Sequence, residues 1–217
     1  MPNESAFCNV SLINLQLIDD RDVWPNCPTN WLWVYDKLIV ARKQNISAGP
    51  AGIPVPHDGN YIVRPITNIR MMSRGASIQR LTRSNPDAVP DGYFWSEIVT
   101  GRHVSVDYYY GQQDLTVEGF RDDAQRLDRF SQWSKISEVY TLPDFINGLG
   151  QIVPWINVEY IGSTAIEVHL RYNDDFRNHS GDVIYPVWRD NPLPQPLNTQ
   201  WYDSPSGDRL GFWVENK

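Results

Sequence analysis

The chain has 217 residues and a mass of 25.0 kDa, with 41% hydrophobic and 21% charged residues, so it can bury a core and is not disordered by composition. Its formal net charge of −7 argues against nucleic acid as the main partner, because such proteins present a basic surface. No apolar run reaches the length of a membrane span, and the opening MPNESAFCNV lacks the features of a signal peptide, so we expect no membrane partner and a cytoplasmic location.

The two cysteines, Cys8 and Cys27, are too few for a disulfide framework. We expect a reduced pair inside a cell, with one bridge between them as the alternative. No group of Cys and His residues has the spacing of a zinc site. The nine Trp and eleven Tyr residues are expected to fill the core of a compact fold.

The spacing of apolar residues predicts a helix over residues 29–45, capped by Thr29 or Asn30. Gly and Pro residues then end this helix, and YIVRPI (61–66) is typical of a short buried strand. The further expected elements are two strands within 92–111 around a turn at Thr100 and Gly101, strands over 114–120 and 133–140, a short helix over 142–150, and a hairpin around Gly162. Strands outnumber helices, which favours an α+β fold with antiparallel sheets and few helices.

The stretch GSTAIEVHLRYN (162–173) places Glu167, His169 and Arg171 at every second position. In a strand this spacing puts all three side chains on one face. A solvated sheet face would accept this pattern, and so would a site for a metal and a phosphate.

Four segments in order resemble the ATP-grasp superfamily. YDKLIVARKQNISAGPAGIPVP is similar to the segment that opens its nucleotide-binding part, and YIVRPI falls where the family has a lysine-bearing strand. SEIVTGRHVSVDYYYG resembles the hinge, closest to the carboxylase branch, and INVEYIGSTAIEVHLRYN resembles the closing pair of strands. Together these segments cover roughly residues 30–175, and the ordered set is more specific than any one of them.

The resemblance implies two small α+β lobes that hold ATP between antiparallel sheets. It divides the chain into an N-terminal segment (1–28), an ATP-grasp-like unit (29–185) with a smaller lobe at about 58–97, and a Pro-rich tail (186–217) that packs on the surface without regular structure. Enzymes of this family activate a carboxylate as an acyl phosphate, which an amine or a similar nucleophile then attacks. Such enzymes normally begin with a separate domain, and we expect that fewer than thirty residues before the first helix leave no room for one here.

The resemblance assigns the phosphates to Lys37 and Arg64, where the family has its two lysines. A solvated helix lysine is the alternative for Lys37, whereas Arg64 keeps the charge with a different geometry. The family's glycine-rich loop corresponds to residues 67–77, where only Gly75 remains and Arg70 and Arg74 add charge. Either these side-chain cations replace the backbone N–H groups that contact phosphate in the family, or this chain has lost phosphate binding.

The hinge residues Ser96, Glu97, Ile98 and Val99 match those whose backbone holds adenine. An edge strand without any role in nucleotide binding would show the same sequence pattern. His103 falls where the carboxylase branch uses histidine for the ribose hydroxyls, and imidazole offers both a donor and an acceptor for a diol. A structural histidine is the alternative.

Glu159, Glu167 and His169 match the family's metal ligands, which implies Mg²⁺ as the ion. If the hairpin loop has an odd number of residues, Glu159 lies opposite Glu167, and a cation between the two carboxylates relieves their repulsion. An even loop would send the two side chains to opposite faces. Histidine replaces an asparagine of the family, so either Mn²⁺ is tolerated or only the two carboxylates bind the ion.

Arg171 follows the family's arginine and is expected to stabilise charge on the transferred phosphoryl group. Lys135 and Arg129 lie where related sequences carry basic residues on the substrate side, although a solvated charge run also explains Arg129. Asn173 is a weaker candidate for the missing amide ligand.

The sequence therefore favours an ATP-dependent carboxylate–amine or carboxylate–thiol ligase, with ATP, Mg²⁺ and a carboxylate-bearing small molecule or peptide as partners. Two alternatives stay open: an inactive nucleotide-binding protein of the same fold, and an aromatic-rich module that contacts another protein. The substrate lobe would be absent, or supplied by the tail, by another chain or by the acceptor itself. The sequence leaves the oligomeric state open.

Overall fold

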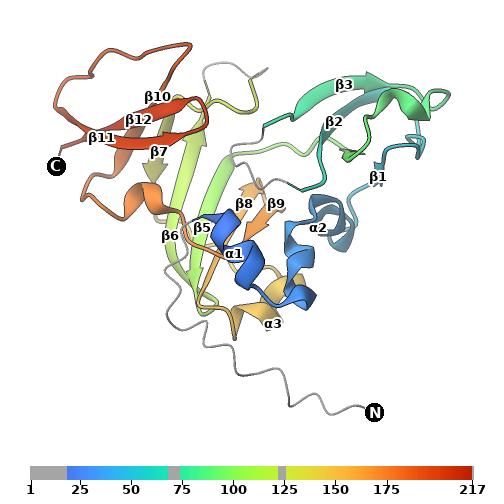
Figure 1. The fold of residues 1–217 in the computed structure, drawn as a ribbon, viewed down its shortest axis with the longest axis horizontal. Helices are drawn as coiled ribbons and strands as arrows, with labels where there is room; N and C mark the ends of the chain where they lie inside the picture. Colours follow the sequence, from blue (N-terminus) through green and yellow to red (C-terminus); the bar gives the residue numbers. More distant parts are fainter. Residues whose placement is uncertain (1–18, 68–73, 122–125, 217) are drawn as a thin grey trace.

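The computed structural model describes residues 19–67, 74–121 and 126–216. Cys8, Arg70 and most of the loop 67–77 lie outside this part of the chain. Within it, the strands form two antiparallel sheets, and Figure 1 shows the smaller sheet beside the helices and the larger one extending to the C-terminus. The expected α+β fold with antiparallel sheets and few helices is confirmed.

The four-stranded sheet has the order β1-β4-β2-β3, and the eight-stranded sheet has the order β11-β12-β10-β7-β6-β5-β8-β9. The strands of the small sheet are β1 (Ala48–Pro50), β2 (Gly59–Pro65), β3 (Ser77–Leu81) and β4 (Tyr93–Ser96). Those of the large sheet are β5 (His103–Tyr109), β6 (Gln112–Phe120), β7 (Gln132–Lys135), β8 (Trp155–Ile161), β9 (Thr164–His169), β10 (Val183–Trp188), β11 (Thr199–Ser206) and β12 (Arg209–Glu215). The α-helices are α1 (Asp20–Asn26), α2 (Lys37–Lys43) and α3 (Asn147–Gly150).

The main core lies between the large sheet and the helices. Valines at alternate positions of the central strands pack there against residues of the amino-terminal helices: Val104, Val106, Val158 and Val168 against Val34, Tyr35 and Val40. Each buried valine side chain contributes roughly 1.5–3 kcal/mol to stability. Because side chains alternate along a strand, the intervening polar residues point to the opposite face of the sheet. These residues are His103, Ser105, Asn157, Glu159, Glu167 and His169.

The single helix expected over 29–45 is two helices. Thr29–Tyr35 forms a 3₁₀ helix, and α2 begins at Lys37 after an extended Asp36. The Asp36 side chain accepts a hydrogen bond from the Ile39 N–H at 2.9 Å, so Asp36, and not Thr29 or Asn30, is the cap that starts the α-helix. Asp36 also forms a bridge with Thr67, beside the end of β2. This break places Lys37 in the first turn of α2, facing the large sheet.

The hairpin of β8 and β9 turns at Gly162 and Ser163, so its loop has two residues and the premise of an odd loop is wrong. Gly162 has φ +61° and lies close to the Thr100 carbonyl, a position that favours glycine. A β-bulge between Glu159 and Tyr160 then adds one residue to β9. The bulge restores the expected pairing, and Glu159 lies directly opposite Glu167.

The prediction that the chain from Pro186 lacks regular structure is wrong. Strand β10 crosses the expected boundary at 185/186, and β11 and β12 form a hairpin at the edge of the large sheet. The prolines are accommodated because Pro192, Pro194 and Pro196 lie in the connection between β10 and β11, whereas Pro205 lies in β11 at the sheet edge.

Other boundaries also differ from the expectations. The small sheet begins at Ala48 and not near residue 58, and the strand expected over 133–140 ends at Lys135. The two strands within 92–111 lie in different sheets, because β4 pairs with β2 and β5 pairs with β8. In the part of the chain that the structure describes, no helix is long and apolar enough to cross a membrane.

Candidate functional site

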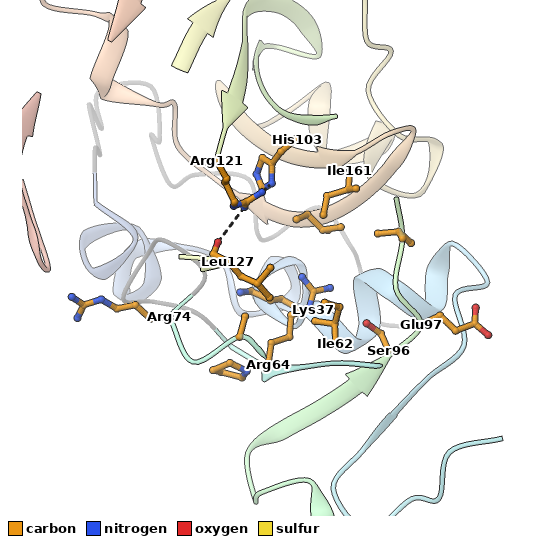
Figure 2. A pocket seen from close by; sticks show the side chains of 14 residues that line it. Lys37, Ile62, Arg64, Arg74, Ser96, Glu97, His103, Arg121, Leu127 and Ile161 are labelled. Carbon is orange, nitrogen blue, oxygen red and sulfur yellow. Dashed lines mark hydrogen bonds between the residues drawn. The ribbon is translucent and has the colours of Figure 1, made fainter. Parts of the chain in front are cut away.

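A cavity lies between the small sheet, helix α2 and the large sheet (Figure 2). Of the residues predicted to contact the nucleotide, seven line it: Lys37, Arg64, Arg74, Ser96, Glu97, Val99 and His103. Ile98 is 40% exposed and lies outside the lining. The rest of the wall is mainly apolar, with Ile62, Pro65, Ile161 and Ile166 among its residues. The structure therefore brings the predicted cations and the hinge residues together around one mainly apolar space.

Two cations line this cavity, the buried Lys37 and the partly buried Arg64. Lys37 is only 3% exposed, so the alternative of a solvated helix lysine is wrong. Its Nζ lies 3.1 Å from Glu167 Oε2, and burial lowers the Lys37 pKa against the opposing effect of that carboxylate. Arg64 lies over the Phe94 ring at 5.1 Å, and burial lowers its pKa as well. Buried charges need a partner, and these two face the acidic pair of β8 and β9.

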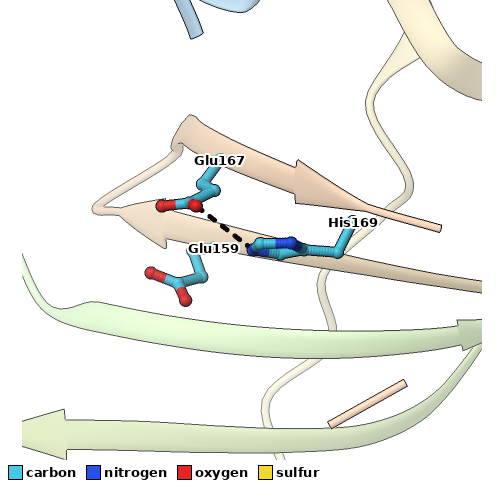
Figure 3. A group of neighbouring side chains, drawn as sticks. All are labelled: Glu159, Glu167 and His169. Atoms are coloured by element: carbon cyan, nitrogen blue, oxygen red, sulfur yellow. Dashed lines mark ion pairs between the residues drawn. The ribbon is translucent and has the colours of Figure 1, made fainter. Parts of the chain in front are cut away.

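Glu159, Glu167 and His169 point toward one another from β8 and β9 (Figure 3). One ligand atom of each lies within 4.8 Å of the others. Burial and mutual repulsion would raise the pKa of both carboxyl groups. Lys37 and His169 nevertheless hold the pKa of Glu167 far below its usual range, and a contact with His103 lowers the pKa of Glu159. Both carboxylates are therefore charged at neutral pH.

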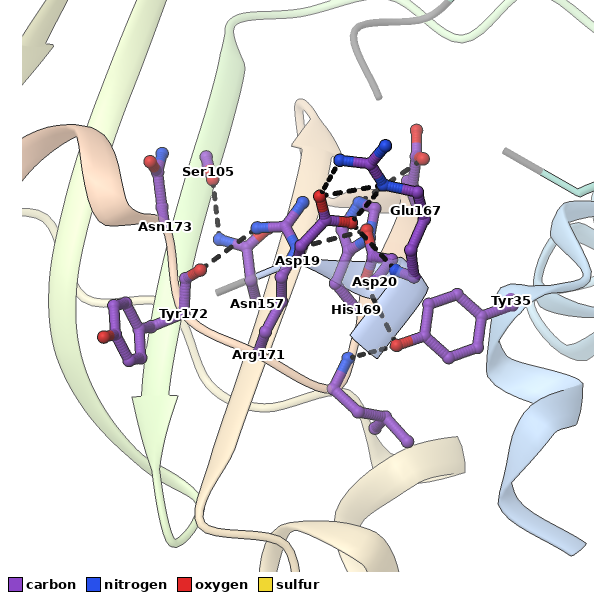
Figure 4. Close-up of polar contacts among 12 residues, drawn as sticks. Asp19, Asp20, Tyr35, Ser105, Asn157, Glu167, His169, Arg171, Tyr172 and Asn173 are labelled. Carbon is purple, nitrogen blue, oxygen red and sulfur yellow. Dashed lines mark hydrogen bonds and ion pairs between the residues drawn. The ribbon is translucent and has the colours of Figure 1, made fainter. Parts of the chain in front are cut away.

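Asp20, a residue that sequence reasoning missed, joins this group from helix α1 (Figure 4). Its side chain is completely buried, with Oδ2 2.8 Å from His169 Nδ1 and 3.1 Å from Arg171 Nε. The Tyr35 hydroxyl donates to Asp20 Oδ1 at 3.1 Å and accepts from the Leu170 N–H at 3.3 Å. In the sequence, Asp20 falls in an N-terminal segment before the first expected helix, and nothing there connects this residue to β9.

These contacts set the charge of both partners in the ion-free protein. Burial would raise the pKa of Asp20, but His169 and Arg171 hold it at about 2. Burial would lower the pKa of His169, but Asp20 and Glu167 raise it to about 9. The Asp20–His169 pair is therefore ionic between these two values.

This pair predicts a specific loss of stability at alkaline pH when metal ions are chelated. The pKa of His169 is raised on folding from 6.5 to about 9, so its contribution is fully present below pH 6.5 and is lost as pH rises through 9. The difference in unfolding free energy between the wild type and His169→Asn should shrink by on the order of 3 kcal/mol across that window. Urea denaturation from pH 6 to 10 measures it, and a constant difference would contradict the ionic pair.

A polar network lies behind the acidic pair. The Asn157 amide donates to Ser105 Oγ and to Asp107 Oδ1, both at 2.8 Å. The Asn173 N–H donates to Asp107 Oδ1 at 2.9 Å, and Asn173 Oδ1 accepts from the Asp175 N–H at 3.0 Å. The Asn173 side chain thus caps the 3₁₀ helix Asp174–Phe176, and its role as an amide ligand of a metal ion stays a prediction. The network fixes the segment that carries Arg171.

Both ring nitrogens of His103 have a partner. Its Nδ1 lies 3.1 Å from Arg121 Nη2, and its Nε2 lies 3.1 Å from Glu159 Oε2. Because an arginine can only donate, Nδ1 accepts and Nε2 carries the proton toward Glu159. Phe130 and Trp133 contact the ring edge-to-face. Contact of His103 with a ribose stays a prediction. Arg121 is, after Asp20, the second residue of the site that sequence reasoning missed.

A larger cavity of about 270 Å³ opens on the other side of the acidic pair. Arg171, Glu159 and His169 line it together with Asn157 and Trp133. Its outer wall comes from the C-terminal hairpin, through Ser204, Pro205, Ser206 and Arg209. Arg209 Nη2 lies 2.8 Å from Asp175 Oδ1, which ties the hairpin to the segment after β9. The tail that was expected to lie on the surface therefore forms part of a cavity.

The two basic residues predicted on the substrate side lie elsewhere. Lys135 has its Nζ 3.5 Å from Asp182 and lies against the Phe176 ring. Arg129 is not part of a solvated run, because its side chain is 16% exposed, contacts Asp190 and lies over the Trp188 ring. Both are engaged within the large sheet and its loops, and neither lines the larger cavity.

No model of a known protein family matches the sequence, and no curated protein sequence matches it. The structure is similar to N5-carboxyaminoimidazole synthetase from Staphylococcus aureus complexed with ADP, with a TM-score of 0.53 and 9% identity over 94% of this chain and 75% of that one. It is also similar to an ATP-grasp superfamily protein from Archaeoglobus fulgidus (TM-score 0.47, 15% identity, 85% of this chain and 64% of that one). An L-amino acid ligase from Bacillus licheniformis gives a TM-score of 0.47 and 10% identity over 77% of this chain and 49% of that one.

The chain has an α+β fold of the ATP-grasp type. That conclusion rests on the Staphylococcus aureus structure, whose match extends over nearly all of this chain. The chain spans about half to two thirds of the length of the other two proteins. At 9% identity the Staphylococcus aureus match establishes the fold alone and leaves the reaction to the residues of the site.

Proposed function

We propose that this protein binds ATP between its two sheets and transfers the terminal phosphoryl group to a carboxylate, giving an acyl phosphate that an amine or a thiol then attacks. The observation that carries the proposal is that Glu159 and Glu167 lie close to the buried Lys37 and the partly buried Arg64, between a mainly apolar cavity and a larger one lined mostly by polar residues. A buried group of strongly perturbed charges between two cavities is a typical functional site.

The nucleotide would occupy the smaller cavity. Lys37 and Arg64 would contact the phosphates, with Arg74 at the rim, and the backbone of Ser96–Val99 would hold the adenine ring. The Glu97 side chain points away from Lys37 and Arg64, and only its backbone serves this role (Figure 2). The cavity measures about 70 Å³, below the 300 Å³ or more of typical ligand sites, so it has to widen to admit a nucleotide.

The donor set fits a divalent ion. Glu159 and Glu167 lie opposite each other in charged form, and His169 offers a third ligand atom within the same 4.8 Å. Two carboxylates with remaining positions for water and phosphate oxygens suit Mg²⁺. When bound, the ion would neutralise phosphate charge and help align the terminal phosphoryl group.

Arg171 would act on the acceptor side. It lines the larger cavity, and Asp20 and the Tyr172 carbonyl orient its guanidinium. A guanidinium held in this way stabilises negative charge that develops on a transferred phosphoryl group. The acceptor carboxylate would enter through the larger cavity, whose outer wall is the C-terminal hairpin.

A second function is favoured by one observation. Both oxygens of Glu167 have a cationic partner within the chain, Oε1 with His169 at 3.3 Å and Oε2 with Lys37 at 3.1 Å. If these contacts persist, the protein binds a nucleotide without turnover. Release of ADP in the presence of a panel of amino acids and other carboxylates distinguishes this outcome from a ligase.

The first test is thermal melting with and without ATP and Mg²⁺. Nucleotide at one hundred times its Kd should stabilise the fold by about 2.7 kcal/mol, which raises the Tm of a chain of this size by roughly 5–10 °C. Lys37→Met should abolish the shift, because it removes a buried phosphate contact. Lys43→Met, at the exposed end of the same helix, is the matched control and should keep the shift. Absence of any nucleotide-dependent shift in the wild type would refute the proposal.

A further inference from the structure

Asp20 links helix α1 to the basic residues beside the acidic pair. It is a completely buried carboxylate in the first turn of α1, and its partners His169 and Arg171 come from β9 and the segment after it. Figure 4 shows α1 lying across the end of β9, with Asp20 between Tyr35 and the two basic side chains. Helix α1 thereby contributes a buried carboxylate to the site.

Asp20 fixes how the His169 ring is turned. Nδ1 lies 2.8 Å from Asp20 Oδ2, so Nε2 is the ring nitrogen that faces the acidic pair, 3.3 Å from Glu167 Oε1. The ring also contacts Tyr35 edge-to-face, with centroids 6.2 Å apart. Figure 3 shows the imidazole pointing along the hairpin toward both carboxylates.

We propose that Asp20 is a positioning residue that holds His169 as the third ligand of the divalent ion and makes the site prefer Mn²⁺ to Mg²⁺. This inference rests on the metal site of the proposed function and adds the identity of the ion and the residue that sets it. A carboxylate behind a ligating histidine fixes the ring and strengthens the ligand, and its loss typically lowers metal affinity 10–100-fold.

The preference for Mn²⁺ follows from the ligand atoms. Mg²⁺ favours a shell made of oxygen atoms, whereas imidazole suits transition metals. The ion displaces the Nε2 proton of His169 to solvent while the Nδ1 proton stays with Asp20, and the site then offers two carboxylates and one nitrogen. Asp20 and Tyr35 are both buried, hydrogen-bonded to each other and in contact with the His169 ring, which favours this ring orientation.

The alternative is that Asp20 only neutralises the basic side chains beside it. In that case the loss of Asp20 would lower stability without changing which ion the site selects. Metal selectivity and the magnetic signature of a bound nitrogen therefore separate the two roles, because a structural role changes neither.

The test uses Mn²⁺ with the wild-type chain and ADP. Pulsed EPR should show ¹⁴N modulation from a directly bound histidine. In competition with Mg²⁺, the ratio of Mn²⁺ affinity to Mg²⁺ affinity should be at least about tenfold larger for the protein with ADP than for free ADP. Asp20→Asn should lower Mn²⁺ affinity 10–100-fold, with Mg²⁺ affinity changed by less than about threefold. Asp22→Asn, an exposed residue of the same helix, is the matched control and should behave as the wild type.

His169→Asn keeps the inference testable if Asp20→Asn does not fold. It should abolish the ¹⁴N signal and remove the preference for Mn²⁺, because an amide oxygen replaces the imidazole. Equal selectivity in the wild type and His169→Asn, or no ¹⁴N signal in a wild type that binds Mn²⁺, would overturn the inference and leave the proposed function standing. Failure of the wild type to bind either ion with ADP would instead refute the metal site of the proposed function.

Discussion

Glu167→Gln should lower the unfolding free energy by roughly 3–5 kcal/mol and remove all stabilisation by ATP with Mg²⁺. The first effect is expected because the amide leaves Lys37 as a buried charge without its carboxylate, and the second because the site loses a ligand of the ion. Urea denaturation with and without the nucleotide measures both effects on one protein.

Glu215→Gln is the control for this prediction, because Glu215 is exposed at the end of β12. Its unfolding free energy should change by less than about 0.5 kcal/mol, and its response to ATP and Mg²⁺ should match that of the wild type. If Glu167→Gln melts at a lower temperature but still gains the full stabilisation from the nucleotide, the assignment of Glu167 as a ligand is wrong.

Arg171→Lys should reduce kcat by roughly 10²–10³-fold while changing the affinity for ATP only a few-fold. Lysine keeps the charge but cannot reproduce the planar group that contacts Asp20 and the Tyr172 carbonyl together. A stabilising donor aimed at developing charge has an effect of this size. The measurement is the rate of ADP release with a carboxylate that the wild type accepts, at saturating ATP.

The matched control is Arg42→Lys, an exposed residue near the end of α2. It should leave both kcat and KM unchanged. An Arg171→Lys variant with wild-type kcat and a raised KM for ATP would show that Arg171 contributes to nucleotide binding and not to transfer.

The fold was largely predictable because its signals are local. The alternation in β8 and β9 and the turn at Gly162 each depend on neighbouring residues, and each of the four resembling segments is recognisable by itself. The structure confirms the resulting α+β architecture. The break at Asp36 and the C-terminal strands were missed for a related reason. The apolar stripe of 29–45 continues across Asp36, and prolines conceal the alternation in β11 and β12.

The site was predictable only where residues share a segment. Lys37 and Arg64 were placed by their segments, and the Glu159–Glu167 pair was reached from a loop of the wrong length because a bulge in β9 compensates for it. Asp20 and Arg121 were missed because their contacts with His169 and His103 join distant parts of the chain. The role proposed for Lys135 stays a prediction, although its Nζ lies 3.5 Å from Asp182 and the residue does not line the larger cavity.

The most direct test of the central claim is a crystal structure of the protein with a non-hydrolysable ATP analogue and a divalent ion. The account predicts an ion held by Glu159 and Glu167, phosphates in contact with Lys37 and Arg64, and the adenine ring beside the backbone of residues 96–99. A nucleotide bound away from the acidic pair, or an ion with neither carboxylate in its shell, would contradict it.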